Sequence, residues 1–268
     1  MGRYFQNPEN FFMTVKMATR VIELIELFAR EKQPLALSEA ARLLEMPVST
    51  CLGLLRTLEK QGYLYETGRR QGYYPTGRLL AMAQVIAAHD PVLDRIRPAL
   101  EELRDATQET VVFAKFREPG RVVYLEVLDS PQSIRYAAEA GETREAYANS
   151  LGRALLSTLP APERKALLQA AKLRKLTEAT LTRAADIEAE LARSAERGWF
   201  ANIGESIADL AGIAWPVRIG GQAWAISVVG PRYRIEPRQE ALAAMLRSAC
   251  RAIEGPERAL LALVPKAA

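Results

Sequence analysis

The stretch that decides the fold of this chain runs from Arg20 to Leu80 and reads RVIELIELFAREKQPLALSEAARLLEMPVSTCLGLLRTLEKQGYLYETGRRQGYYPTGRLL. Apolar residues recur at helical spacing over residues 15–28, 39–44 and 48–61, with breaks at Pro34 and Pro47. Two short aromatic segments then flank a glycine-containing tip, which is typical of a β-hairpin. The order of helix, short helix, turn, helix and hairpin predicts a winged helix-turn-helix that binds double-stranded DNA.

The third predicted helix has two different faces. Its apolar face is expected to pack on the first two helices through Cys51, Leu54, Leu55 and Leu58. Its other face is expected to point outward into the major groove with Ser49, Leu52, Gly53 and Arg56. Ser49 and Thr50 are candidates for phosphate or base-edge contacts, Arg56 for phosphate or guanine, and Leu52 for a thymine methyl group. The alternative is that Ser49 only caps the helix and Leu52 is buried.

Three further residues complete the candidate DNA contacts. Ser38 is expected to cap the second helix, and Arg69 and Arg70 lie at the hairpin tip. The two arginines form either a wing that grips the DNA backbone or an ordinary hydrophilic turn. Residues 1–80 contain 11 Lys and Arg against 8 Asp and Glu, whereas the remainder contains 25 against 24. The basic excess therefore lies mostly in the first third, which is suggestive of an anionic partner there. The alternative is a solvated surface with a slight basic bias.

The rest of the chain predicts a second, larger domain. We expect a tail over residues 1–14, the winged helix-turn-helix over 15–76, a connector helix over 77–90 and the second domain over 91–268, after Asp90-Pro91. Helical patterns in this domain cover residues 92–108, 149–171, 183–197 and 237–253, and the second of them is interrupted at Pro160 and Pro162. Extended segments cover residues 110–116, 122–127, 134–138, 199–201, 212–218 and 222–229. Strands grouped between helices predict an α+β domain built on an antiparallel sheet.

Several classes of protein are disfavoured by the composition and by missing motifs. No apolar run approaches the roughly 18 residues of a membrane span, and residues 1–14 lack the pattern of a secretory signal. Cys51 and Cys250 are far apart and fall in helical patterns, so a reducing cytoplasm is expected. His89 is the single histidine, and the sequence contains no G-x-S-x-G, phosphate loop or metal-ligand cluster. We therefore expect no catalysis, no cofactor and no metal.

The sequence resembles the IclR family of bacterial transcription regulators. Residues 20–80 resemble the DNA-binding domain of that family over their whole length. The stretches YANSLGRALLSTL (147–159) and RGWFANIGESIADLAGIAWPVRIGGQAWAISVVGP (197–231) resemble its effector-binding domain more loosely. Together the resemblance covers roughly residues 15–255. It implies self-association as a dimer or a dimer of dimers, and a GAF-like domain that binds small carboxylates or aromatic catabolites.

By position, the resemblance also implies a set of residues around the effector pocket. They are Ser150, Leu151, Asn202, Leu210, Gly212, Ser227 and Val229. For each of them, ordinary packing in a core or turn is the alternative. Trp215 and Trp224 are candidates for aromatic walls of the pocket, although strand alternation could send one of them outward.

Four positions depart from the family pattern. Val48 and Gly53 stand where Lys and Arg are common, which removes two cations from the recognition helix. Asn202 stands where an acidic residue is frequent and Gly212 where Cys is common, which predicts a bulkier ligand or one whose charge is met elsewhere. The changes at the recognition helix motivate a rival function: a ligand-sensing or protein-docking module whose winged helix no longer binds specific DNA.

Overall fold

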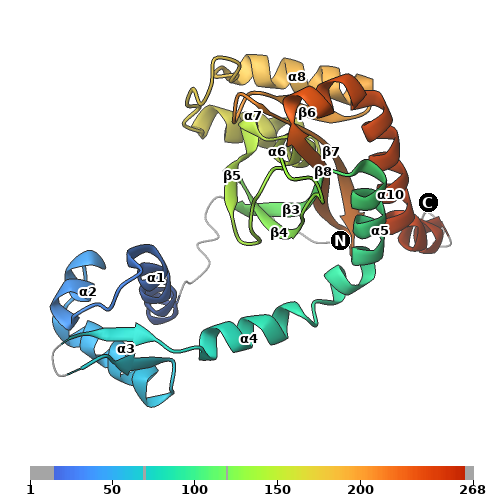
Figure 1. The fold of residues 1–268 in the computed structure, drawn as a ribbon. Helices are drawn as coiled ribbons and strands as arrows, with labels where there is room; N and C mark the ends of the chain where they lie inside the picture. The colour runs from blue at the N-terminus through green and yellow to red at the C-terminus, as the bar shows by residue number, and fades with distance from the viewer. Residues whose placement is uncertain (1–14, 69–70, 119, 263–268) are drawn as a thin grey trace, which may run out of the picture. The chain divides into compact units, whose positions relative to one another are not determined.

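The computed structural model describes residues 15–68, 71–118 and 120–262 (Figure 1). Contacts between Cα atoms divide the chain into two compact units, residues 1–90 and 91–268. The expected tail over residues 1–14 and the two tip arginines, Arg69 and Arg70, lie outside the described residues. Within the described ranges, no helix has the length and apolar content needed to cross a membrane.

The first unit is a winged helix-turn-helix followed by one more helix. Its elements are α1 (Lys16–Glu31), α2 (Leu37–Leu43), α3 (Val48–Lys60), β1 (Leu64–Glu66), β2 (Tyr73–Pro75) and α4 (Arg78–Ala87). β1 and β2 form an antiparallel hairpin, and a backbone bridge between Leu35 and Tyr73 extends it. Gly62, at a positive φ of 76°, ends α3 and turns the chain so that the Tyr63 amide reaches the Leu58 carbonyl.

The core of this unit is built from the predicted apolar faces. The fully or nearly buried side chains include Leu24, Leu27, Phe28, Leu35, Ala40, Cys51, Leu54, Leu55, Leu58 and Leu64. The helical pattern of α3 is confirmed, because all four residues of its expected inner face are buried. The first unit therefore holds α3 rigidly by one side and leaves the other side in solvent.

The expected N-cap at Ser38 is wrong. α2 begins one residue earlier, at Leu37, after the extended residue Ala36. The Ala36 carbonyl accepts hydrogen bonds from the amides of Glu39 and Ala40, and the cap position has no side-chain hydrogen bond. Ser38 is thus an exposed residue within the first turn. The reason is that backbone geometry at Ala36 starts the helix without a side-chain cap.

The second unit contains an antiparallel sheet that is covered on both faces by helices. Among the described residues, six strands lie in the order β5-β4-β3-β8-β7-β6, and every adjacent pair is antiparallel. The strands are β3 (Thr110–Glu118), β4 (Arg121–Leu128), β5 (Thr143–Glu145), β6 (Phe200–Ile203), β7 (Leu210–Ile219) and β8 (Gln222–Pro231). The helices are α5 (Pro91–Thr107), α6 (Ser150–Leu156), α7 (Ala161–Ala170), α8 (Ala184–Arg197), α9 (Arg232–Ile235) and α10 (Gln239–Ala262). The α+β class predicted from sequence is confirmed.

The two faces of the sheet bury different helices. Successive side chains of a strand point to opposite faces, so in β3 Phe113 packs with α5 and α10, whereas Val112 packs with α6, α7 and α8. Trp215 and Trp224 both belong to the Phe113 side, where Trp224 stacks on Phe113 at 5.1 Å between ring centroids. Strand alternation therefore places both tryptophans on the face of the sheet opposite α6.

Two differences from the predicted elements bear on the site. Residues 134–138, expected to be a strand, are irregular, and the edge position beside β4 is taken by β5 instead. β5 pairs Thr143 with Val123 and Glu145 with Arg121. The short polar triplet of β5 has no hydrophobic alternation to predict it. The predicted helix over residues 149–171 consists of α6 and α7, and α7 begins after Pro160.

Candidate DNA-contact helix and ligand cavity

The outward face of α3 is accessible and carries few internal bonds. Ser49, Gly53 and Arg56 are exposed, and Thr50 and Leu52 are half-buried. The residue before the helix is Pro47 and no side chain caps it, so Ser49 does not cap the helix. Among the described residues, Arg56 makes no hydrogen bond or ion pair. This face can offer a hydroxyl group, a methyl-bearing side chain and a guanidinium group to a partner.

Gly53 is not required by packing. A Cβ atom built there meets no heavy atom within 4 Å. Val48, the other departure from the family pattern, is 53% exposed. Both positions therefore lie where a longer side chain would extend into solvent or toward a bound duplex.

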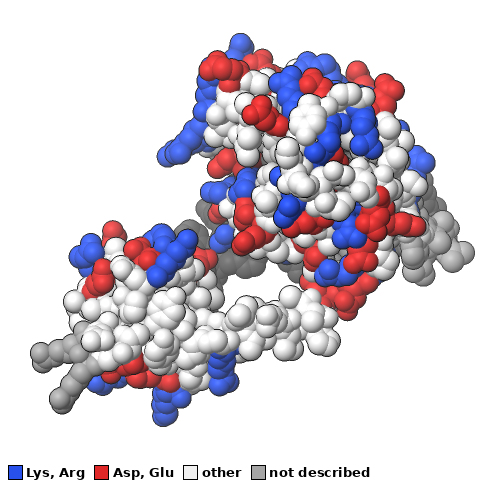
Figure 2. All heavy atoms as spheres, in the orientation of Figure 1, with Lys and Arg blue, Asp and Glu red and all other residues white. Residues whose placement is uncertain are grey.

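The helix α4 exposes an unusual amount of apolar surface. None of its residues is buried, and its exposed apolar side chains are Leu80, Met82, Val85 and Ile86. In Figure 2 the same segment is almost free of charged side chains on the face shown. Contiguous exposed apolar surface of this kind marks an interaction site more often than ordinary solvent-facing helix.

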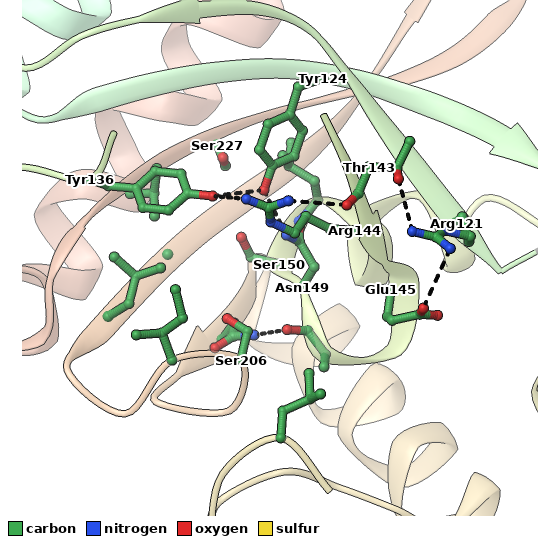
Figure 3. Close-up of a pocket in the computed structure, with 18 residues that line it drawn as sticks. Arg121, Tyr124, Tyr136, Thr143, Arg144, Glu145, Asn149, Ser150, Ser206 and Ser227 are labelled. Atoms are coloured by element: carbon green, nitrogen blue, oxygen red, sulfur yellow. Dashed lines mark hydrogen bonds and ion pairs between the residues drawn. The ribbon is translucent and has the colours of Figure 1, made fainter. Parts of the chain in front are cut away.

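A cavity of about 190 Å³ lies in the second unit between the sheet and the α6 side (Figure 3). All seven residues predicted for the effector pocket line it, although they come from α6, β6, β7 and β8. The complete lining is Arg121, Tyr124, Tyr136, Thr143, Arg144, Glu145, Ala148, Asn149, Ser150, Leu151, Leu176, Asn202, Ser206, Ile207, Leu210, Gly212, Ser227 and Val229. Neither Trp215 nor Trp224 is among these residues, so the prediction that they form aromatic walls of the pocket is wrong.

The start of α6 is fixed in place by Asn149 and by a close backbone contact. The Asn149 carbonyl oxygen accepts from the amides of Leu151 at 2.9 Å and Gly152 at 3.4 Å. A Cβ at Gly152 would lie only 2.3 Å from the Ala146 Cα, so this contact needs glycine. These restraints hold Ser150 and Leu151 at the wall of the cavity.

Gly212 leaves space inside the cavity. A Cβ there would lie 3.0 Å from the Ser150 hydroxyl oxygen and 3.4 Å from a methyl group of Val229. Ser150 and Ser227 are buried, and neither hydroxyl group makes a hydrogen bond among the described residues. A ligand can therefore find two polar groups on this side of the cavity that have no protein partner.

The side chain of Asn202 is fixed by hydrogen bonds to backbone groups of the protein. Its amide donates to the Ala148 carbonyl, and its oxygen accepts from the Glu205 amide at 3.1 Å. The Glu205 carboxylate is bound by the buried guanidinium of Arg153, which also donates to the Ala201 carbonyl at 2.8 Å. This network supports the cavity wall that contains Asn202 and Ser206.

A cluster of two tyrosines and one arginine forms another part of the wall. The Tyr124 and Tyr136 hydroxyl oxygens are 3.4 Å apart, and the Arg144 guanidinium donates to Tyr136 at 3.5 Å. The guanidinium also lies 5.6 Å from the centre of the Tyr124 ring. Burial, followed by the nearby Tyr136, raises the pKa of Tyr124 well above its ordinary value. The Tyr124 phenol therefore stays protonated at neutral pH.

Sequence reasoning missed this cluster. Tyr124 lies on a predicted strand, where its two-residue spacing from Val122 places both on the same face. That spacing was the available signal for Tyr124. Tyr136 and Arg144 lie in and beside the irregular segment, where no periodic pattern shows which way a side chain points.

The two cysteines are poor candidates for chemistry. Cys51 and Cys250 are both buried, and burial raises the pKa of each thiol. A protonated buried thiol is a weak nucleophile and a weak metal ligand. The described residues contain no group of three His, Cys, Asp or Glu side chains placed to hold a metal ion.

Comparison with family models accounts for both units. Residues 17–68 match the model of the IclR helix-turn-helix domain. Residues 84–255, more than half of the chain, match the model described as bacterial transcriptional regulator IclR, C-terminal.

Individual relatives agree with these matches. The transcriptional regulator KdgR of Escherichia coli is 26% identical over 246 residues, covering 90% of this chain and 92% of that protein. The transcriptional repressor IclR of the same organism is 25% identical over 186 residues, covering 69% and 68%. A solved IclR homolog from Microbacterium hydrocarbonoxydans, complexed with 4-hydroxybenzoate, is 26% identical with a TM-score of 0.73, covering 91% of this chain and 99% of that one. These relatives are transcription regulators or their homologs.

Proposed function

The chain belongs to the IclR family of DNA-binding transcription regulators, and we propose that α3 contacts its operator while a small effector in the cavity changes that binding. The residues proposed for DNA contact are Ser49, Thr50, Leu52 and Arg56, together with Arg69 and Arg70 of the wing. The exposed Ser38 of α2 is kept as a candidate for a phosphate contact, without its expected capping role.

One observation carries the effector half of the proposal. The seven residues predicted for the pocket come from four separate elements and line the same small space. Convergence of a few polar groups with apolar walls in one concave site is the usual form of a small-molecule pocket. Packing alone does not account for the buried Ser150 and Ser227 hydroxyl groups, which line this space and make no hydrogen bond within the described part of the chain.

The effector is proposed to be a small organic acid or aromatic compound. The cavity volume of about 190 Å³ suits a molecule of few heavy atoms. The bound 4-hydroxybenzoate of the Microbacterium hydrocarbonoxydans homolog shows that one relative of this fold holds a molecule of that kind.

Self-association is proposed to cover the apolar surface of α4. Leu80, Val85 and Ile86 are each more than 60% exposed in the single chain. A second copy of the chain would remove this surface from water and would place two recognition helices on one DNA site, as regulators with repeated half-sites require. The proposed location is a bacterial cytoplasm, where two free buried cysteines are stable.

The proposed regulation is a shift between two arrangements of the assembly. An effector that binds one arrangement more tightly shifts the population toward it by that difference in affinity and no more. The connector over residues 77–90 joins the two units and is proposed to pass the difference to the spacing of the recognition helices.

The experiment measures fluorescence anisotropy of labelled promoter DNA from beside the gene, titrated with the full chain. It is run at two salt concentrations with random duplex as competitor. We expect selective binding that weakens steeply as salt rises, because each phosphate contact releases counterions. Folded protein that shows no selectivity at either salt concentration would contradict DNA recognition and would favour the sensing or docking module instead.

A further inference from the structure

The tyrosine and arginine cluster has a fixed direction of hydrogen bonding. The Asn149 oxygen already accepts from two backbone amides, so its amide nitrogen is the atom that faces Tyr124 and donates to it at 3.0 Å. An arginine side chain has donors only, so Arg144 also donates to Tyr136. Both neighbours of the phenol pair are therefore donors, and neither can accept a phenol proton.

A count of the protons follows from this arrangement. The two phenols have two O–H groups, and among the described residues the only acceptor in reach of either is the other phenol. One O–H can be used in that bond, at 3.4 Å. The second has no acceptor among the described residues, although Tyr124 and Tyr136 are each more than nine-tenths buried. Both residues line the cavity, so a molecule bound there can supply the missing acceptor.

We propose that Arg144, Tyr124 and Tyr136 form a donor-only subsite that binds the carboxylate of the effector and selects it over the matching neutral amide. This inference rests on the proposed effector function of the cavity. A carboxylate only accepts hydrogen bonds and therefore matches the free phenol O–H and the guanidinium, whereas an amide or alcohol brings its own donors to a cluster whose protein neighbours are already donors. Hydrogen bonds to a charged group are also the stronger ones.

The other charges around the cavity favour a single carboxylate. Arg121 donates to the Thr143 hydroxyl at 2.8 Å and lies 3.9 Å from the Glu145 carboxylate, so its charge is partly compensated. Glu145 also lines the cavity and would repel a second anion. Glu142 pairs with Arg144 but is not part of the lining, so an incoming carboxylate would share the guanidinium with it.

The body of the effector would meet apolar side chains. Leu151, Leu176, Ile207, Leu210 and Val229 lie around the cavity. The subsite therefore describes a small monocarboxylate with an apolar body, oriented with its acid group toward the tyrosines.

The first test is calorimetric binding to the full chain with acetate, pyruvate and benzoate, each against its amide. We expect at least one carboxylate to bind roughly tenfold or more tightly than its amide, as loss of a charged hydrogen bond predicts. Amides that bind as well as the acids, or phenyl phosphate that binds better than benzoate, would overturn the subsite. No binding by any probe would overturn it as well, while the DNA titration, which uses no probe, would still judge the regulator independently.

The second test compares two neighbouring variants that should change affinity in opposite directions. Arg144→Gln should weaken binding of the tightest-binding carboxylate by roughly 10- to 100-fold, and binding of the matching amide by less than about threefold. Glu142→Gln removes the anion that competes for Arg144 and should increase the affinity for the carboxylate by a few-fold. The control is Arg183→Gln, which makes the same change in net charge as Arg144→Gln but at an exposed residue outside the lining. It should not change the affinity for the carboxylate.

Tyr136→Phe provides a milder variant that keeps the ring in the core. It removes one O–H from the cluster and should weaken carboxylate binding by roughly three- to tenfold. Circular dichroism of each variant checks that the fold is kept. Equal losses of affinity in Arg144→Gln and Glu142→Gln would show that the cluster acts only on local structure, and unchanged affinity in Arg144→Gln would remove it from the site.

Discussion

The outward face of α3 and the wall of the cavity use polar side chains in different ways. Arg56 extends from an exposed helix surface and makes no hydrogen bond or ion pair among the described residues. Arg153, behind the cavity, is 1% exposed and donates to Glu205 and to two backbone carbonyls. The first arrangement leaves charge available to a large anionic partner, whereas the second sets the shape of a small site before a ligand arrives. The same type of residue should therefore respond very differently to substitution.

The largest effect is expected from Arg153→Met. This change leaves the Glu205 carboxylate buried without its partner, which costs about 3–5 kcal/mol in comparable buried pairs. Urea unfolding should show a loss of that size in the second unit. The control is Arg193→Met, which breaks an ion pair whose arginine is 61% exposed and should cost less than about 1 kcal/mol. Equal losses in the two variants would contradict the difference between a buried and an exposed arginine.

Arg56→Ala tests the opposite side of the comparison. It should weaken operator binding by about 1–3 kcal/mol while effector affinity, unfolding free energy and oligomeric state stay unchanged. A contact to a phosphate would also reduce the slope of log affinity against log salt by about 1. Anisotropy with the operator gives both quantities. Equal affinity in the variant and the parent protein would remove Arg56 from the DNA contacts.

The buried phenol of Tyr124 predicts loss of stability at alkaline pH. Its pKa is raised in the folded state, so the unfolded chain loses the proton first, near the ordinary tyrosine pKa of 10.0. Stability is therefore constant with respect to this group at lower pH and falls above about pH 10, by up to about 1.4 kcal/mol per pH unit. Urea unfolding at pH 9 to 11 should show a shallower decline for Tyr124→Phe. Tyr233→Phe, at a residue that is 64% exposed, should keep the steeper decline.

Gly53→Ala is expected to have the smallest effect. The space around Gly53 is open, so alanine adds no clash and should stabilise α3 by about 1 kcal/mol through helix propensity. Thermal unfolding of the first unit measures this gain. A decrease in stability would show that the glycine is needed for a backbone distortion that the helix geometry does not contain.

The elements with regular periodicity were predictable and the irregular ones were not. The buried positions of α3 and the strands of the large sheet other than β5 follow from helical spacing and strand alternation, because both reflect burial on one side. Segment 134–138 looks like a strand by composition, but the edge of β4 is paired with the polar triplet at Thr143–Glu145. Edge pairing depends on which segment the chain can bring there, and no local pattern shows that.

The cavity shows the same division. Ser150 and Gly212 could be placed by resemblance, because they lie in well-matched stretches of the sequence. Tyr136 lies on an irregular segment and Arg144 on the short strand β5, and their side-chain directions depend on tertiary packing. Alternation left the orientation of the tryptophans open, and the structure places Trp215 and Trp224 on the far face of the sheet.

The most direct test of the account is the coupling between the cavity and the DNA. Operator affinity of the full chain is measured by anisotropy with and without a saturating amount of the carboxylate that binds best by calorimetry. We expect the dissociation constant for DNA to change by about fivefold or more, a coupling of at least about 1 kcal/mol. In the Arg144→Gln variant, the same concentration of ligand should change the dissociation constant for DNA only slightly. Unchanged DNA affinity in the parent protein, with the cavity shown by calorimetry to be occupied, would contradict regulation through this site.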